Sequence, residues 1–278
     1  MINESLKTLP VDVISVQSQV VYGCVGNSVA IPTLQRMGFS AAAVPTVMFS
    51  NTPHYPSLYG GAVPDEWFRG YLRGLDDRGV AGQTRAVLVG YMGGPSQAEI
   101  LAEWLTQLVA RRPEIMVIID PVIGDYDTGI YVDPRMTRAY LDTLLPHAQG
   151  MTPNCFELET LTGRRITTID QAIAAARTLL TGRTRWVVVT SAAPAPLDDS
   201  EQAMRVIMVT RDQEQVFAHP RINATPKGTG DLFSAALTGY MLKNIPLPQA
   251  IEHAYRDVMA TLERTRRYGC GELLLHDR

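Results

Sequence analysis

The sequence has few cysteines, and they do not cluster. Cys24, Cys155 and Cys270 are the only three in 278 residues, and neither a Cys-x-x-Cys pair nor a Cys/His group accompanies them. Widely spaced cysteines in odd number argue against a disulfide framework, and the missing cluster argues against a structural zinc site. We therefore expect a zinc-independent protein in a reducing compartment, the cytoplasm.

An excess of basic charge is also absent. Lys and Arg number 25 against 28 Asp and Glu, which gives a formal net charge of −3. Nucleic acid and anionic membranes normally require a basic face, so we expect neither as the main partner. No apolar run reaches the roughly 18 residues that span a bilayer. The start of the chain lacks the basic and apolar regions of a signal peptide.

Short apolar runs rich in β-branched residues recur along the chain. Most are apolar throughout, which is typical of strands buried on both faces. They cover residues 11–16, 41–49, 85–92, 115–124, 185–192, 205–210 and 215–222. Segments with helical spacing lie between or after them, at 65–78, 96–112, 168–182 and 231–244. The alternation predicts an α/β fold with a mostly parallel central sheet and helices on both faces. The last two runs flank "RDQEQ" (211–215), which predicts a hairpin and hence an antiparallel edge.

The chain shows no internal boundary between domains. It contains no repeat and no low-complexity segment, and the Pro-rich and acidic stretch 191–202 is a loop too short to be a linker. We therefore expect a single domain over residues 1–278. Residues 1–10 carry no motif and are the candidates for disorder.

The stretch "PKGTGDLFSAAL" (226–237) places a glycine-rich turn before an apolar helix. The first turn of a helix has unpaired N–H groups and partial positive charge, so residues 228–230 can form an anion hole for a phosphoryl group. Asp231 is costly beside an anion unless it serves as general base toward an attacking alcohol, and Lys227 can neutralise phosphate charge. The alternative is that Asp231 caps the helix after an ordinary turn. The stretch matches neither GxxxxGK[ST] nor GxGxxG.

This motif resembles the anion hole of the ribokinase superfamily, whose members phosphorylate hydroxymethyl groups with ATP. Further stretches resemble the pyridoxal kinases within it: "VQSQVVYGCVGNSVA" (16–30), "PTVMFSNTPHYPSLYGG" (45–61), "VIIDPVIGDYDTGIYV" (117–132), "MTPNCFELETLTG" (151–163) and "VVVTSA" (187–192). The resemblance implies a ribokinase-like fold and ATP-dependent phosphorylation of the 5′-hydroxymethyl group of pyridoxal, pyridoxine and pyridoxamine, a reaction of vitamin B6 salvage. It also implies Mg²⁺ with the ATP, K⁺ as activator, and a homodimer.

The candidate substrate residues lie in the first two of these stretches. Ser18, just after the first predicted strand, and His54, in a loop with two tyrosines, can hydrogen-bond an aromatic ring. A capping Ser and an exposed His are the alternatives. The resemblance implies that both contact the vitamer, with Val47 and Phe49 as apolar walls. Tyr91 is either another aromatic wall or a packed core residue.

The candidate nucleotide residues follow the later strands. Asp120 ends an apolar strand, where a carboxylate suits a hydrated Mg²⁺ that bridges phosphates. The polar segment between Gly124 and Gly129 is interpreted as a flap, with Asp127 in solvent. The spacing of Asn154 and Glu157 is also that of a capping box, the structural alternative to binding. The resemblance implies that catalysis involves Gly228, Thr229, Gly230 and Asp231, and that Asp120, Tyr131 and Glu157 form a metal site. It also implies contacts with ATP by Asp120, Asp125, Thr152, Asn154, Glu157, Thr190, His219, Pro220, Arg221, Ile222, Lys227, Gly228 and Gly230.

Two other functions stay open. Hydroxymethylpyrimidine kinase is a sister activity on the same fold, and Ser18 and His54 argue against it as the main role. A non-catalytic pyridoxal-phosphate binding protein is the second, and the intact Gly-Thr-Gly-Asp sequence argues against it, because a binder gains nothing from an acid beside phosphate.

Overall fold

The structure is a computed structural model that describes residues 7–192, 203–224 and 226–277. Residues 1–6 of the N-terminal segment and residues 193–202 of the expected loop lie outside the described residues. Residues 7–10 are described and form neither helix nor strand. Within the described ranges, no helix is long and apolar enough to cross a membrane.

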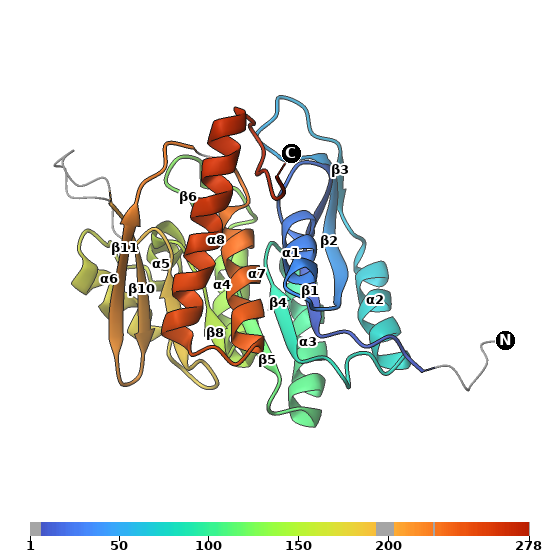
Figure 1. The fold of residues 1–278 in the computed structure, drawn as a ribbon. Coiled ribbons are helices and arrows are strands. Elements are labelled where there is room, and N and C mark those ends of the chain that lie inside the picture. The colour runs from blue at the N-terminus through green and yellow to red at the C-terminus, as the bar shows by residue number, and fades with distance from the viewer. Residues whose placement is uncertain (1–6, 193–202, 225, 278) are drawn as a thin grey trace.

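A nine-stranded sheet runs through the centre of the molecule in the order β11-β10-β9-β8-β5-β4-β1-β2-β3 (Figure 1). The strands are β1 (Val13–Tyr22), β2 (Ala41–Asn51), β3 (Gly60–Ala62), β4 (Ala86–Val89), β5 (Met116–Ile119), β8 (Gly150–Met151), β9 (Trp186–Val189), β10 (Ala203–Thr210) and β11 (Glu214–Pro220). The strands from β9 to β2 are mutually parallel. β10 is antiparallel to both β9 and β11, which confirms the predicted hairpin and antiparallel edge.

The other edge of the sheet is antiparallel as well, because β3 pairs with β2 in that direction. This second antiparallel edge is not among the predictions. Two of the three residues of β3 are glycine, so the strand has no hydrophobic pattern to reveal it.

Helices cover both faces of the sheet, as predicted (Figure 1). They are α1 (Asn27–Arg36), α2 (Asp65–Asp77), α3 (Pro95–Arg111), α4 (Met136–Arg138), the π-helical turn η1 (Ala139–Leu144), the 3₁₀ turn η2 (Leu145–His147), α5 (Cys155–Thr162), α6 (Ile169–Thr178), α7 (Thr229–Leu242) and α8 (Leu247–Tyr268). Alternate residues of a strand point to opposite faces. In β4, Ala86 and Leu88 join a core with α1, α7 and α8, whereas Val87 and Val89 join a core with α2, α3, α5 and α6.

The position of Ser18 differs from the prediction. β1 does not end at residue 16 but continues to Tyr22, so Ser18 lies within a strand rather than after one. β4 pairs only with Val13–Val16. Beyond that point β1 pairs with β2 alone, and the register shifts between Gln17 and Gln19, so that Ser18 lies opposite two residues of β2, Thr46 and Val47, in a bulge. Bulges redirect a side chain and are frequent beside active sites.

Candidate active site

The Gly-Thr-Gly turn leads directly into α7. The helix follows Gly228, whose φ of 93° favours glycine. A Cβ atom at Gly228 would lie 2.0 Å from the carbonyl oxygen of Cys24, so a larger residue does not fit. Gly228 is the N-cap residue and no side chain caps the helix, which is at variance with Asp231 as an ordinary cap. The first N–H groups of α7 are therefore available to an anion.

Two carboxylates meet at this helix terminus. Asp231 lies in the first turn of α7, and Asp120 follows β5. Burial raises the pKa of Asp120 to about 8, the charge of Asp231 adds to the rise, and hydrogen bonds from the hydroxyls of Thr152 and Ser234 oppose it. Burial also raises the pKa of Asp231, against a hydrogen bond from the Gly26 N–H. Like charges in an enclosed place favour the binding of a cation or a proton.

Asn154 and Glu157 form a complete capping box at the start of α5. The Glu157 N–H donates to Asn154 Oδ1 at 2.8 Å, and the Asn154 N–H donates to Glu157 Oε2 at 2.8 Å. Glu157 Oε1 accepts a further hydrogen bond from the Ile123 N–H at 3.0 Å, and Asn154 Nδ2 donates to the Gly124 carbonyl at 2.9 Å. The box therefore also anchors the chain that follows β5.

The carboxyl ends of neighbouring strands bring the remaining polar groups together. The Thr152 hydroxyl, just after β8, donates to Asp120 Oδ1 at 3.1 Å. Thr190 follows β9, where its N–H donates to the Pro153 carbonyl at 2.9 Å and a β-bridge joins it to Asn154. Parallel strands place such groups at one edge of the sheet, where ligands of α/β proteins bind.

A cavity of about 370 Å³ opens at this edge. It is of the size that small-molecule ligands occupy. Its lining includes all the predicted nucleotide, catalytic and metal residues: Asp120, Asp125, Tyr131, Thr152, Asn154, Glu157, Thr190, His219, Pro220, Arg221, Ile222, Lys227, Gly228, Thr229, Gly230 and Asp231. The predicted flap forms its rim as a two-stranded ribbon, β6 (Gly124–Asp125) and β7 (Gly129–Ile130), with Asp127 exposed as expected.

The predicted metal residues differ in how well they suit Mg²⁺. Asp120 and Asp231 offer hard oxygen ligands to one place, which fits a hydrated Mg²⁺ completed by phosphate oxygens. Both oxygens of Glu157 already accept backbone N–H groups, so Glu157 fits a role in anchoring better than direct ligation. Burial and the surrounding carboxylates raise the pKa of Tyr131, so its phenol stays neutral. Among the described residues no three His, Cys, Asp or Glu side chains form a ready-made metal site.

The predicted vitamer residues do not line this cavity but lie beyond Asp231. The link is the turn after β1: the Gly26 N–H donates to the Asp231 carboxylate, and a Cβ at Gly26 would lie 2.2 Å from Ser18 Oγ. Val47 is buried in β2, with Phe49 half-buried two residues on. Tyr91 lies two residues after β4, and its carbonyl accepts a hydrogen bond from the Thr46 hydroxyl at 2.7 Å. Ser18 is thus the predicted vitamer residue that the turn after β1 connects to Asp231.

Comparison with known proteins agrees with this geometry. Residues 31–276 match the family model described as phosphomethylpyrimidine kinase. A pyridoxine/pyridoxal/pyridoxamine kinase of Bordetella bronchiseptica is 58% identical over 272 residues, which cover 98% of this chain and 95% of that protein. The chain belongs to this kinase family.

Solved structures related to the family have the same fold. The pyridoxal kinase from Leishmania donovani, in complex with ADP and pyridoxamine, has a TM-score of 0.86 at 29% identity and covers 95% of this chain and 90% of its own. A Bacteroides thetaiotaomicron protein described as a phosphomethylpyrimidine kinase, in a crystal form with pyridoxal, has a TM-score of 0.81 at 26% identity over 92% and 88% of the chains. The predicted ribokinase-like fold and kinase class are confirmed.

Several site residues of this family member escaped the sequence-based prediction. α8 supplies a wall of the cavity, with Tyr255, Val258, Met259 and Leu262. The Tyr255 ring stacks on His219 at 5.1 Å between centroids and 19° between planes. The amphipathic pattern of 247–268 could have identified the helix, but no motif marks its contact with the cavity.

Cys24 lies in the turn between the two groups of residues. Burial, followed by the nearby charge of Glu272 and by Cys270, raises the pKa of its thiol to about 11. A thiol with such a pKa is protonated near neutral pH and is a poor nucleophile.

Proposed function

We propose that this chain, as a single kinase domain, transfers the γ-phosphoryl group of ATP to the 5′-hydroxymethyl group of pyridoxal, pyridoxine and pyridoxamine. Asp231 takes the hydroxyl proton as the oxygen bonds to the γ-phosphorus and the bond to the ADP oxygen breaks. The N–H groups of residues 228–230 and Lys227 stabilise the transferring charge. The products are the vitamer 5′-phosphate and ADP.

One observation carries this proposal: the carboxylate of Asp231 lies where the cavity meets the turn after β1, which packs against Ser18. ATP fits the cavity side, with its phosphates toward α7 and its base toward residues 219–222. The vitamer fits the other side, where Ser18 and His54 hydrogen-bond its ring and Val47, Phe49 and Tyr91 enclose it. A base with a raised pKa is also better matched to proton removal near neutral pH.

Mg²⁺ and K⁺ form part of the proposal. The paired carboxylates of Asp120 and Asp231 support a divalent cation beside the phosphates, with Thr152 holding Asp120 in place and Tyr131 and Glu157 in the surrounding shell. When bound, Mg²⁺ supplies charge neutralisation of the phosphate oxygens. The expectation of K⁺ rests on the resemblance alone.

A homodimer in a reducing cytoplasm completes the proposal. Support for a dimer comes from large apolar side chains exposed near the β3 edge of the sheet: Val21 (81% exposed), Tyr22 (60%), Met48 (43%), Leu58 (40%) and Tyr59 (71%). Exposed apolar patches often mark protein interfaces. All three cysteines lie in the described part of the chain and are free thiols there.

A second candidate function is phosphorylation of hydroxymethylpyrimidine, and the matching family model supports a pyrimidine substrate because it is described as phosphomethylpyrimidine kinase. The two activities differ in the ring that the β1–β2 side must receive. The nucleotide side and Asp231 would serve both.

The test is ATP-dependent phosphorylation by the purified protein, with Mg²⁺ and K⁺, of pyridoxal and hydroxymethylpyrimidine in parallel. We expect turnover of pyridoxal to fall by at least about 1,000-fold in Asp231→Ala, because general-base and electrostatic losses combine. Calorimetry should show that the variant still binds ATP. Turnover of the pyrimidine alone would select the second function, and binding of pyridoxal 5′-phosphate without turnover of either would select a binding protein.

A further inference from the structure

The C-terminal tail folds back over the turn that follows β1. α8 ends at Tyr268, and Gly269 follows with a φ of 71°, which reverses the chain direction. Leu273 and Leu275 of the tail are then buried in a small core with Val29 of α1 and Leu232 of α7. The tail is therefore packed against the elements that carry the site.

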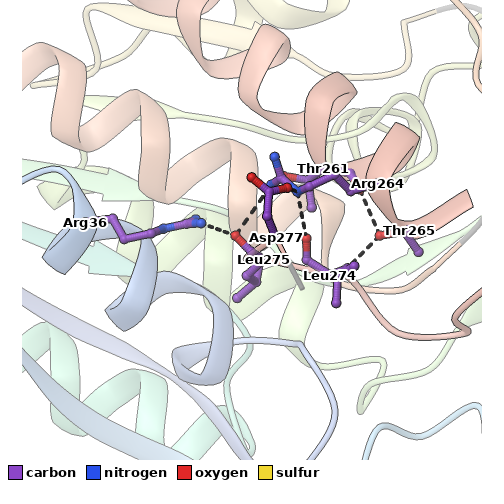
Figure 2. Close-up of polar contacts among 7 residues, drawn as sticks. All are labelled: Arg36, Thr261, Arg264, Thr265, Leu274, Leu275 and Asp277. Carbon is purple, nitrogen blue, oxygen red and sulfur yellow. Dashed lines mark hydrogen bonds and ion pairs between the residues drawn. The ribbon is translucent and has the colours of Figure 1, made fainter. Parts of the chain in front are cut away.

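Two arginines fix the backbone of the tail (Figure 2). Arg36 of α1 donates to the Leu275 carbonyl. Arg264 of α8 donates to the carbonyls of Leu274 at 3.2 Å and Leu275 at 3.4 Å, and the Thr265 hydroxyl accepts the Leu274 N–H at 2.9 Å. Hydrogen bonds from charged donors to these carbonyls define the position of the segment, and with it the position of the neighbouring residue 272.

Glu272 is a buried carboxylate at the vitamer side of the site. It is 5% exposed, and its Oε2 accepts the N–H of Cys24 at 2.9 Å. Its Oε1 lies 3.7 Å from Nε2 of His54. A Cβ at Gly23 would lie 2.9 Å from Glu272 Oε1 and 1.9 Å from Thr52 Oγ1, so the turn, the carboxylate and the His54 loop are in close contact.

The carboxylate has one oxygen without a hydrogen bond. Among the described residues, Glu272 Oε1 is buried and meets no donor at good hydrogen-bond geometry, while the Tyr55 side chain interacts with the same carboxylate group. Buried charges are costly unless paired, and His54 Nε2 is near enough to become that partner through a small movement. With Nε2–H directed at Glu272, the other ring nitrogen, Nδ1, is left as an acceptor for a hydroxyl group of a ligand.

We propose that Glu272 is a positioning residue for vitamer binding: it holds the tautomer and orientation of His54 and the Gly23–Cys24 turn, so that the pyridine ring is received in one orientation. This inference rests on the proposed function. Glu272 touches neither the nucleotide cavity nor the reacting atoms, and it acts through His54. It therefore affects the binding of the vitamer and leaves the binding of ATP unchanged.

The test compares the wild type with Glu272→Gln in steady-state kinetics, with pyridoxal and ATP varied in turn. The carboxamide keeps the volume and can still accept the Cys24 N–H, but it presents N–H rather than an acceptor to His54. We expect the KM for pyridoxal to rise about tenfold, as for loss of one charged hydrogen bond. The KM for ATP and the melting temperature should change little.

A double-mutant cycle decides whether the effect passes through His54. In the His54→Ala background, Glu272→Gln should have no further effect on the KM for pyridoxal, because the partner is gone. The matched control is Asp277→Asn, in the same tail, whose side chain is 90% exposed and pairs with Arg264 at 3.6 Å. It should leave both KM values within about twofold, since exposed ion pairs contribute little.

Three results would overturn the inference: an unchanged KM for pyridoxal in Glu272→Gln, an equal rise in the KM for ATP, or a full effect in the His54→Ala background. Calorimetric binding of pyridoxal to the same variants separates this inference from the proposed function. A wild type that binds pyridoxal without phosphorylating it would contradict the proposed function, while the ratio of dissociation constants would still decide the role of Glu272. A wild type that does not bind pyridoxal would overturn both.

Discussion

The buried carboxyl group of Asp120 lies beside a second carboxylate, Asp231, and this arrangement opposes folding. Its pKa rises to about 8 through burial and then through Asp231, against roughly 3.9 in an unfolded chain. Below the pKa of the unfolded chain, the carboxyl group is protonated in both states and does not destabilise the fold. As pH rises from that pKa to the folded pKa, the unfolded chain ionises first and the folded protein loses stability, and the loss is complete above the folded pKa. We infer that a cation bound beside the phosphates reduces the repulsion between Asp120 and Asp231, which explains why two carboxylates lie together at this site.

Asp120→Asn should therefore stabilise the protein in the absence of nucleotide and divalent metal. The carboxamide can still accept the Thr152 hydroxyl but cannot ionise. We expect the stability difference between Asp120→Asn and the wild type to increase by about 3 kcal/mol between roughly pH 5.5 and pH 8.5, since one pKa unit corresponds to about 1.36 kcal/mol. Urea unfolding across that range measures it, and Asp127→Asn, at an exposed position, is the control. Parallel pH curves for wild type and Asp120→Asn would contradict the raised pKa.

Single residues were predictable where chemistry follows a strand or a helix start. Asp120 and Thr190 come directly after apolar residues, which predicts that they lie at one edge of a parallel sheet. Thr152 follows "HAQGM", which is not an apolar run, and its place in the site is implied by the resemblance. Glu272 could not be found in this way. Its partner Cys24 lies 248 positions away in the chain, and nothing in the local sequence "GELLL" distinguishes it from a surface acid.

Among the elements, α5 shows that the capping and binding interpretations of one motif are compatible. Asn154 caps the helix and also holds the Gly124 carbonyl, at the start of the β6–β7 ribbon on the cavity rim. The residue therefore couples helix stability to the position of the ribbon over the proposed ATP site.

Asn154→Ala should lower the free energy of unfolding by about 1–2 kcal/mol through loss of the cap. It should also raise the KM for ATP several-fold, because the ribbon loses its anchor. Thr168→Ala is a matched control: Thr168 caps α6, accepts the Gln171 N–H at 3.2 Å and is not part of the cavity lining. It should reduce stability by a similar amount without affecting the KM for ATP. Equal kinetics in the two variants would show that Asn154 is a cap only.

Element boundaries were less predictable than element types. The apolar runs that predict β4 and β5 extend past the observed strands, because residues such as Tyr91 and Ile123 are apolar for packing after the pairing has ended. β1 is longer than its apolar run, because its second half includes polar residues around the bulge at Ser18 and pairs on one side only. Bulges depend on the neighbouring strand, so one strand's sequence does not reveal them.

For the whole molecule, the parallel sheet covered on both faces followed from the alternation of apolar runs and helical segments. The order of the strands did not, because pairing of distant strands leaves no local signal. The two antiparallel edges have different surfaces: β11 carries Val216 at 41% exposure, whereas large apolar side chains gather near β3. Exposed edges and apolar patches usually need a cover or a partner.

The apolar residues near β3 predict where two copies of the chain associate. Tyr22 pairs in register with Asn51, and the Tyr59 carbonyl accepts the Ser50 N–H, so the exposed side chains belong to neighbouring strands. A stable interface buries about 800 Å² per partner, and a charge at its centre is strongly unfavourable. In sedimentation velocity at micromolar concentration, the wild type should have twice the chain mass of 30.6 kDa, and Val21→Glu should have the mass of one chain. Val216→Glu, at the opposite edge of the sheet, should remain dimeric. If Val21→Glu is dimeric, the interface lies elsewhere on the surface. If the wild type is monomeric, the apolar patch does not join two copies of this chain.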